Sequence, residues 1–180
     1  MLKKAPVPAA IAHLYFETIH PFEDGNGRIG RAIAEKALSQ TLGRPVLPSL
    51  SRTIEGEKRA YYRALEVAQK SNEISPWIHY FVHLTLDALK QTRQVVDFIV
   101  KKSRFFDRYK EQFNERQAKV IRKMFEAGPE GFQGGMSAKK YMAITETSKA
   151  TAARDLHQLL EWEVLRVEGL GRSTHYTLNL

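Results

Sequence analysis

Residues 20–31 read HPFEDGNGRIGR and bring together one histidine, two carboxylates, three glycines, one asparagine and two arginines. Because a residue that precedes proline disfavours the α conformation, His20 before Pro21 predicts the end of a helix. Apolar positions return at helical spacing after Gly27, which predicts that a second helix begins there. We therefore expect a polar loop between two helices.

The flanking segments predict those two helices. The first is expected over Pro8–Ile19, and the second runs from the loop to Gly43, a residue type common just past a helix end. The apolar positions that repeat at helical spacing are Ile11, Leu14, Tyr15 and Ile19 before the loop, and Ile29, Ala32, Ile33 and Ala37 after it. Each set is expected to face the core.

Two more helices are predicted downstream. The third covers Ser51–Lys70, and the fourth opens with Ser75 as N-cap and Pro76 at the first helical position, continuing to about Lys102. The apolar stripe of the fourth helix is Ile78, Phe81, Val82, Thr85, Leu86 and Leu89.

A second unit follows a charged segment. Residues 103–113 are expected to form a linker or connecting helix, which separates a domain of residues 1–102 from one of residues 114–180. In the second domain we expect a helix capped by Asn114 with Gln117, a short helix from Ser137, a longer one from Thr147 or Ser148 to Trp162, and two strands at 164–167 and 174–178. Helix, helix, helix, hairpin is the order of a winged helix.

The composition restricts the class of protein. The chain has 180 residues, of which 43% are hydrophobic, no cysteine and a formal charge of +8, from 28 Lys and Arg against 20 Asp and Glu. No leader and no membrane-spanning apolar run is evident, so a soluble, cytoplasmic protein is expected, with no membrane partner. The positive charge favours an anionic partner such as a nucleotide or a nucleic acid.

The loop has the chemistry of a phosphate site. A glycine-rich turn that enters a helix presents unpaired N–H groups beside the positive end of the helix dipole, and Gly25, Asn26 and Gly27 supply that turn. Arg28 and Arg31 lie three residues apart, so both can reach a polyphosphate from one helix face.

Three further side chains of the loop have expected roles. Asp24 among phosphates predicts a magnesium ligand, and His20 can accept a proton near neutral pH as a general base. Phe22 is expected to be buried and to anchor the loop. The alternative is structural, because His-Pro, Asp-Gly and Asn-Gly are also ordinary helix-end and turn dipeptides.

HPFEDGNGRIGR resembles the Fic family signature: His-Pro-Phe, any residue, Asp or Glu, Gly-Asn-Gly-Arg, any two residues, Arg. AAIAHLYFETIHPF resembles the helix leading into that loop, and PVLPSLS, KRAYYRALEVAQ and ISPWIHYFVHLTL resemble the helices after it, so the similarity covers roughly residues 5–100. The part from NERQAKVI to GRSTHYTL resembles the winged-helix domain that follows some Fic domains. The implied fold is a Fic-type helical core followed by a small winged helix-turn-helix domain.

The resemblance implies an adenylyltransferase that moves AMP from ATP to a Tyr, Thr or Ser hydroxyl of a target protein and releases pyrophosphate. By this similarity His20 is the base, Asp24 holds Mg²⁺, and the loop glycines with Asn26 bind the α- and β-phosphates. Arg28 and Arg31 hold the β- and γ-phosphates. The positions that correspond to adenine contacts in the family are Tyr61, Tyr62 and Gln69, with core packing as the alternative for the tyrosines.

Two parts of the family pattern have no clear counterpart. The target-presenting hairpin lies upstream of the motif helix in the family, and this chain starts too close to the motif to contain it. The inhibitory pattern, Ser or Thr, three residues, Glu, then Gly or Asn, is matched by SRTIEG at 51–56 with Glu55 in the inhibitory position. We interpret that match as a coincidence, because Ser51 opens the third helix.

Two other functions stay open. Relatives that phosphorylate replace the second glycine of the loop, so Gly27 favours AMP transfer over a Fic-like kinase. A DNA-binding regulator with a relict Fic domain is the other alternative, although residues 103–180 hold only 13 Lys and Arg against 10 Asp and Glu. Protein docking and a homodimer are also compatible with this domain. The residues that would contact DNA are Lys149, Thr151, Arg154, His157 and, on the wing, Arg172.

Overall fold

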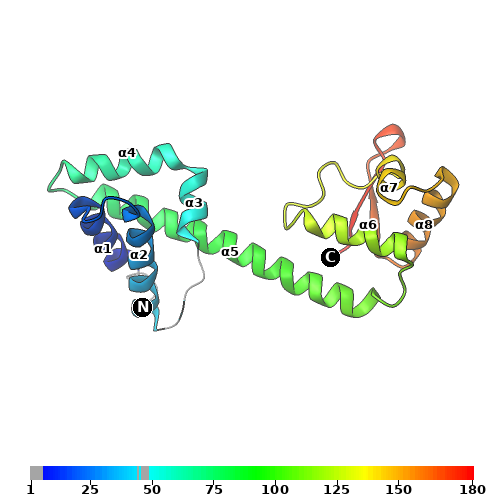
Figure 1. The fold of residues 1–180 in the computed structure, drawn as a ribbon, viewed down its shortest axis with the longest axis horizontal. Helices are drawn as coiled ribbons and strands as arrows, with labels where there is room; N and C mark the ends of the chain where they lie inside the picture. Colours follow the sequence, from blue (N-terminus) through cyan, green and yellow to red (C-terminus); the bar gives the residue numbers. More distant parts are fainter. Residues whose placement is uncertain (1–5, 44, 46–48) are drawn as a thin grey trace. The chain divides into compact units, whose positions relative to one another are not determined.

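The structure, a computed structural model, describes residues 6–43, 45 and 49–180. Over these residues the protein is mainly α, as predicted, with eight α-helices and one two-stranded antiparallel sheet (Figure 1). The chain divides into two compact units, Met1–Arg93 and Gln94–Leu180, and each has its own apolar core. None of the described helices has both the length and the apolar character that a bilayer span requires.

The first unit contains four helices and the beginning of a fifth. These are α1 (Pro6–Ile19), α2 (Asn26–Leu42), α3 (Leu50–Gly56), α4 (Lys58–Gln69) and the first part of α5 (Ser75–Tyr109). Helix α1 packs mainly against α2 and also contacts α4. The loop 20–25 therefore joins two helices that lie side by side.

Several of the buried residues of α1 and α2 are small, and the predicted apolar stripes are buried only in part. The buried positions include Ala9 and Ala10 on α1 and Gly30 and Ala34 on α2. The distance between two packed helices depends on the side chains at the contact, so alanine and glycine permit close approach. The expected inward direction of three α1 side chains is wrong, because Ile11, Tyr15 and Ile19 are exposed.

The predicted third helix is interrupted. Helix α3 begins after Ser49, whose side chain accepts a hydrogen bond from the Arg52 backbone N–H, and ends at Gly56. Glu57 has φ −128° and separates α3 from α4. Glycine is a poor helix former, which is a physical reason for a break at this point. Tyr61 lies on the buried face of α4.

Helix α5 is longer than predicted. It continues past Lys102 to Tyr109, because Phe105 and Tyr109 are buried in the core of the second unit and keep one face of the helix packed. The stripe predicted near its start is only partly buried, since Leu86 and Leu89 are exposed.

The second unit continues with three helices and a hairpin, in the predicted order. These are α6 (Glu115–Glu126), α7 (Ala138–Thr145), α8 (Lys149–Glu161), β1 (Leu165–Glu168) and β2 (His175–Leu178). The predicted capping box of Asn114 and Gln117 is confirmed, and Ser137 and Ser148 cap α7 and α8. The strands pair in antiparallel register from Leu165 opposite Leu178 to Glu168 opposite His175.

Candidate functional site

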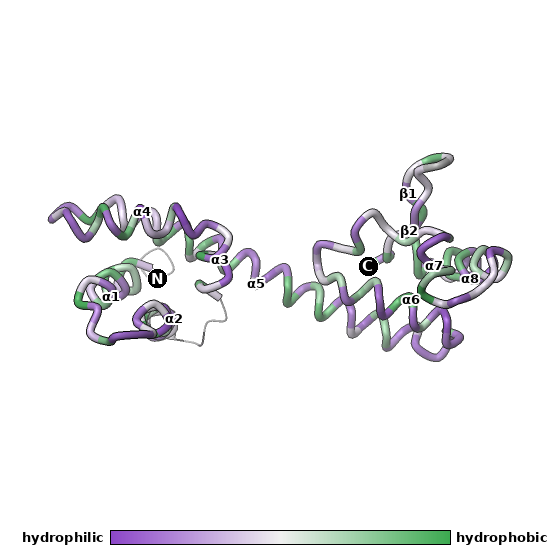
Figure 2. The backbone as a smooth tube through the Cα atoms, turned by 45° about the horizontal axis from the view of Figure 1, so that its top comes forward, coloured by the Kyte–Doolittle hydropathy of each residue, from purple (hydrophilic) through white to green (hydrophobic). Residues whose placement is uncertain are grey.

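The site begins where α1 ends, in a connection that is mostly hydrophilic (Figure 2). His20 has φ 48° and its backbone N–H donates to the Phe16 carbonyl at 3.0 Å. A left-handed conformation at a residue other than glycine costs roughly 1–3 kcal/mol and requires support from its surroundings. The His20 side chain is exposed at this turn.

The side chain of Asn26 holds the loop two residues after His20. Asn26 is 2% exposed, its Oδ1 accepts from the Phe22 N–H at 3.0 Å, and its Nδ2 donates to the Phe22 carbonyl. The loop is therefore held through the backbone of Phe22. The prediction that the Phe22 ring is buried is wrong, because the residue is 50% exposed, although its ring contacts that of Phe16. This role of Asn26 was not predicted from the sequence, although the preference of asparagine for hydrogen bonds to the local backbone favours it.

The glycine turn forms the start of α2. Gly25 is the N-cap with φ 85°, a left-handed conformation that glycine adopts without steric cost, and its N–H donates to Asp24 Oδ1 at 2.6 Å. The first N–H groups of a helix have no acceptor within the helix, and those of Asn26 and Gly27 occupy this position. The turn therefore offers backbone donors to an anion.

Both arginine side chains lie against this turn. A Cβ added to Gly25 would lie 3.4 Å from Arg28 Nη2, and one added to Gly27 would lie 3.2 Å from Arg31 Nη1. Arg28 also pairs with Asp24 at 3.3 Å. Arg28 thus lies against Gly25 and Arg31 against Gly27, and a Cβ at Gly27 would crowd the Arg31 guanidinium.

Ser51 positions the second arginine. Arg31 Nε donates to Ser51 Oγ at 2.8 Å, which connects α2 to α3. The sequence analysis did not assign this role. Glu55, in the apparent inhibitory match, is exposed and pairs with Lys58 at 3.6 Å, so the structure records no pairing of Glu55 with Arg31.

A buried carboxylate lies close to these cations. Glu17 of α1 is 7% exposed, and the sequence analysis did not identify it as a site residue. Burial raises the pKa of Glu17, whereas the positive charges of His20 and Arg31 lower it in part. Of the basic side chains of the loop region, His20 and Arg31 therefore act on this carboxyl group.

The residues expected to border adenine occupy different environments. Tyr61 is 2% exposed and its hydroxyl hydrogen-bonds His13 Nε2 at 2.8 Å, while Tyr62 is 56% exposed and contacts the Tyr61 ring edge-on. Burial raises the pKa of Tyr61 far above its usual range. Gln69 Nε2 donates to the Glu17 carbonyl at 3.1 Å.

The only carboxylate that the sequence analysis proposed as a metal ligand is Asp24. Its side chain is 94% exposed, and within the described residues no three His, Cys, Asp or Glu side chains gather into a metal site. Mg²⁺ is commonly held by one or two carboxylates together with phosphate oxygens and water. A single exposed carboxylate beside a turn with free backbone N–H groups fits that donor set.

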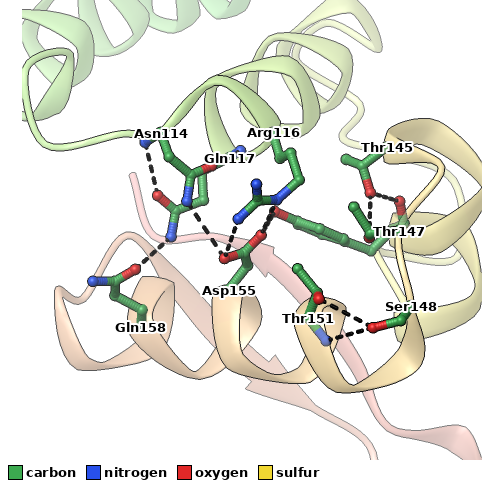
Figure 3. Close-up of polar contacts among 10 residues, drawn as sticks. Asn114, Arg116, Gln117, Thr145, Thr147, Ser148, Thr151, Asp155 and Gln158 are labelled. Carbon is green, nitrogen blue, oxygen red and sulfur yellow. Dashed lines mark hydrogen bonds and ion pairs between the residues drawn. The ribbon is translucent and has the colours of Figure 1, made fainter.

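In the second unit, a buried polar network joins α8 to α6 and α7 (Figure 3). Asp155 is 4% exposed and receives hydrogen bonds from Arg116 at 2.9 and 3.3 Å and from the Tyr141 hydroxyl at 2.9 Å. The network continues through Gln117, whose Nε2 donates to Gln158 at 2.9 Å. The contacts connect α6, α7 and α8.

The side chains of the four α8 residues proposed to contact DNA form no hydrogen bond with Asp155 or Gln117 in that network. Lys149, Arg154 and His157 are exposed, Thr151 is partly exposed, and His157 pairs with Glu161 at 3.5 Å. The side chain of Arg172 lies outside the described part of the structure.

Residues 3–38 match the model of the Fic/DOC family. The fold is similar to the crystal structure of a Fic family protein from Desulfovibrio desulfuricans G20, with 23% sequence identity and a TM-score of 0.46. The match covers 97% of this chain and 49% of that protein, so the chain spans about half the length of its structural relative.

Proposed function

We propose that the first unit is a Fic-type adenylyltransferase that transfers AMP from ATP to a hydroxyl side chain of a target protein. The observation that carries the proposal is the position of two guanidiniums, Arg28 and Arg31, against a glycine turn with free helix N–H groups, and this turn follows His20 by five to seven residues. The family match over residues 3–38 includes this loop.

The chemistry follows from where each group lies. With the β- and γ-phosphates on Arg28 and Arg31, the α-phosphorus faces the His20 side of the loop. The target hydroxyl oxygen bonds to the α-phosphorus, its proton passes to His20, and the bond from the α-phosphorus to the bridging oxygen breaks. Pyrophosphate leaves, and its negative charge is stabilised by the guanidiniums and the backbone N–H groups of the turn.

Asp24 is the residue proposed to hold Mg²⁺, which would neutralise charge on the phosphates. We propose that Tyr62, which is exposed on α4, contacts the base together with Gln69, which lies on the same helix face seven residues later. Tyr61 is proposed to support the Tyr62 ring without contacting the nucleotide itself. Its ring packs edge-on against Tyr62, and its hydroxyl is hydrogen-bonded to His13.

Isotope labelling tests the reaction. The chain is incubated with a cell extract and with ATP labelled either at the α- or at the γ-phosphate. We expect α-label on protein, lost in His20→Ala and kept in His79→Ala, an exposed histidine of α5 that serves as the matched control. Transfer of the γ-label would support a kinase instead, and transfer that survives His20→Ala would refute the assignment of the base.

Nucleic-acid binding by the second unit is a second candidate function, and one observation favours it. Asp155 carries a negative charge on the same helix, which would repel DNA if the side chain were exposed. In the structure it is buried and paired with Arg116. The exposed face of the first turns of α8 therefore presents Lys149 and Arg154 without that negative charge. We propose that this face contacts duplex DNA, in the manner of a winged helix.

Fluorescence anisotropy on a labelled duplex tests that second candidate. Binding should weaken steeply between 50 and 200 mM salt, as expected for about two or more phosphate contacts. Lys149→Ala with Arg154→Ala should reduce the affinity, and Lys90→Ala, on an exposed face of α5, should not. Binding that does not respond to salt, or that the double variant leaves intact, would exclude α8 as the contact.

A further inference from the structure

A cavity in the first unit lies outside the loop that carries His20. Its volume is about 430 Å³, within the range of sites that bind small molecules. It is lined by residues of α4 and of the beginning of α5, and the larger part of this lining is apolar: Ala60, Ala64, Val67, Pro76, Trp77 and Tyr80. The reaction proposed above uses none of these residues.

Small side chains on α4 leave this space open. Ala60, Ala64 and Ala68 line the cavity, and they share one face of the helix because they are four residues apart. Tyr62 is two residues from both Ala60 and Ala64, and residues two apart on a helix do not face the same side. The cavity therefore lies on a different face of α4 from the residue proposed to contact adenine.

Two aromatic rings of α5 form part of the cavity wall. Trp77 is 1% exposed, and its indole N–H donates to the Ala10 carbonyl at 2.8 Å, which fixes the ring. The centroid of the Tyr80 ring lies 6.0 Å from that of Trp77. Because this apolar surface is already ordered, a ligand would lose little binding free energy in arranging it.

The charged residues of the lining favour an anion. Arg59 and Arg63 are both exposed and lie four residues apart on α4, so their guanidiniums can reach one ligand group. Among the described residues, neither side chain forms an ion pair or a hydrogen bond. Glu73 is the one carboxylate of the lining, and its Oε1 already accepts a hydrogen bond from the Ser75 N–H at 2.8 Å. The two guanidiniums are thus available to a ligand.

We infer that this cavity binds a small amphipathic anion, whose apolar part packs on the two aromatic rings and whose head group pairs with Arg59 and Arg63. Guanidinium groups bind carboxylates through paired N–H donors, so a medium-chain carboxylate has the required chemistry. The site goes beyond the proposed transfer of AMP and does not depend on it, because it uses another face of α4.

Three compounds with the same apolar chain test this inference. Octanoate, octanol and octylamine are anionic, neutral and cationic near pH 7. In calorimetric titration of the full chain, octanoate should bind about three- to tenfold more tightly than octanol, the effect of exposed ion pairs, and octylamine should bind most weakly. Arg59→Gln with Arg63→Gln should remove the preference for octanoate. Arg52→Gln, an exposed arginine of α3, is the matched control and should retain it.

Tryptophan fluorescence locates the site. The chain has two tryptophans, so Trp162→Phe leaves Trp77 as the reporter. Octanoate should change its emission with the same Kd that calorimetry gives. Ala60→Phe places a ring in the cavity from an exposed position and should abolish both signals.

Thermal melts show whether Ala60→Phe is folded, and the arginine pair supplies the test if it is not. Absence of octanoate binding, equal affinities for the three compounds, or a preference for octanoate that survives the loss of both arginines would overturn the inference. Octanoate binding that a folded Ala60→Phe leaves intact would also overturn it, because the ligand would then occupy another place.

Discussion

Gly30 of α2 lies directly against the carboxylate of Glu17 of α1. A Cβ on Gly30 would overlap Glu17 Oε1 and would come within 3.2 Å of His13 Cε1. A side chain at this position would therefore force the Glu17 carboxylate to move, although the φ angle of Gly30 is ordinary. The same contact places a buried acid next to the loop that carries His20.

Gly30→Ala should destabilise the first unit by about 1–3 kcal/mol, the usual effect of forcing an extra methyl group into a packed site. Urea unfolding measures the loss. Gly56→Ala is the matched control, because no atom lies within 4 Å of the added Cβ. It should leave stability unchanged or raise it by up to about 1 kcal/mol, the difference in helix propensity. Equal effects of the two substitutions would contradict the packing argument.

Substitutions of the two tyrosines of α4 should have different effects on stability and on ATP binding. Tyr61→Phe leaves His13 Nε2 buried without its 2.8 Å partner, which should cost about 1–3 kcal/mol of stability with little change in ATP affinity. Tyr62→Ala should weaken ATP binding by about two- to tenfold, the value of a lost aromatic contact, with little effect on stability. Thermal melts and calorimetric titration with ATP measure both. The reverse result would place Tyr61 at the nucleotide.

Local rules predicted the ends of several elements correctly. His20 before Pro21 ends α1, Gly43 with φ 66° ends α2, and Asn114 with Gln117 opens α6. Each of these features depends on residues only a few positions apart, so the sequence contains all of the information that determines them.

Packing faces could not be predicted in the same way. Ile11 and Ile29 look like core residues by hydropathy, yet both are exposed, while Gly30 lies buried at the helix interface. Which residues are buried depends on how closely two helices approach each other. The periodicity within one helix contains no information about that distance. For the same reason the continuation of α5 to Tyr109 was missed, because the core that buries Tyr109 is built from later segments.

In the candidate site, too, the features that depend on neighbouring residues could be predicted and those that depend on the fold could not. The loop residues from His20 to Arg31 could be selected from the sequence because they are contiguous, and the structure brings the Arg28 and Arg31 side chains to the glycine turn. Ser51 lies 20 residues from Arg31, and nothing in the chain between them signals the hydrogen bond. Glu17 was overlooked because an isolated glutamate in a helix is usually solvated, and only the fold reveals its burial.

Asn26→Ala should disrupt the loop without touching an arginine. It removes both hydrogen bonds to the Phe22 backbone, so the expected loss is about 1–3 kcal/mol of stability together with weaker ATP binding. Glu23→Ala, an exposed position of the same loop, is the control and should have little effect on stability. Differential scanning calorimetry with and without ATP measures both quantities. Normal ATP affinity in Asn26→Ala would show that the loop conformation is not needed for binding.

The stability of the second unit should fall at acid pH because Asp155 becomes protonated. Burial raises the pKa of Asp155, but the hydrogen bonds from Arg116 and Tyr141 and the charge of Arg116 outweigh it, so the pKa lies below its ordinary value. A carboxyl group with a depressed pKa in the folded state stabilises the fold above its unfolded pKa, about 3.9, and loses that contribution as pH falls through the folded value.

Hydrogen exchange of the α6 and α8 amides between pH 7 and pH 2 measures this dependence. Wild-type protection, corrected for the intrinsic exchange rate, should decline below about pH 4, where the unfolded carboxyl group begins to bind protons. Asp155→Asn should lower protection at pH 7 by about 1–3 kcal/mol and flatten the decline, because the ion pair with Arg116 is already lost. Asp107→Asn, an exposed position of α5, controls for the change of charge. An acid transition of the same size in Asp155→Asn would mean that other carboxylates hold α6, α7 and α8 together.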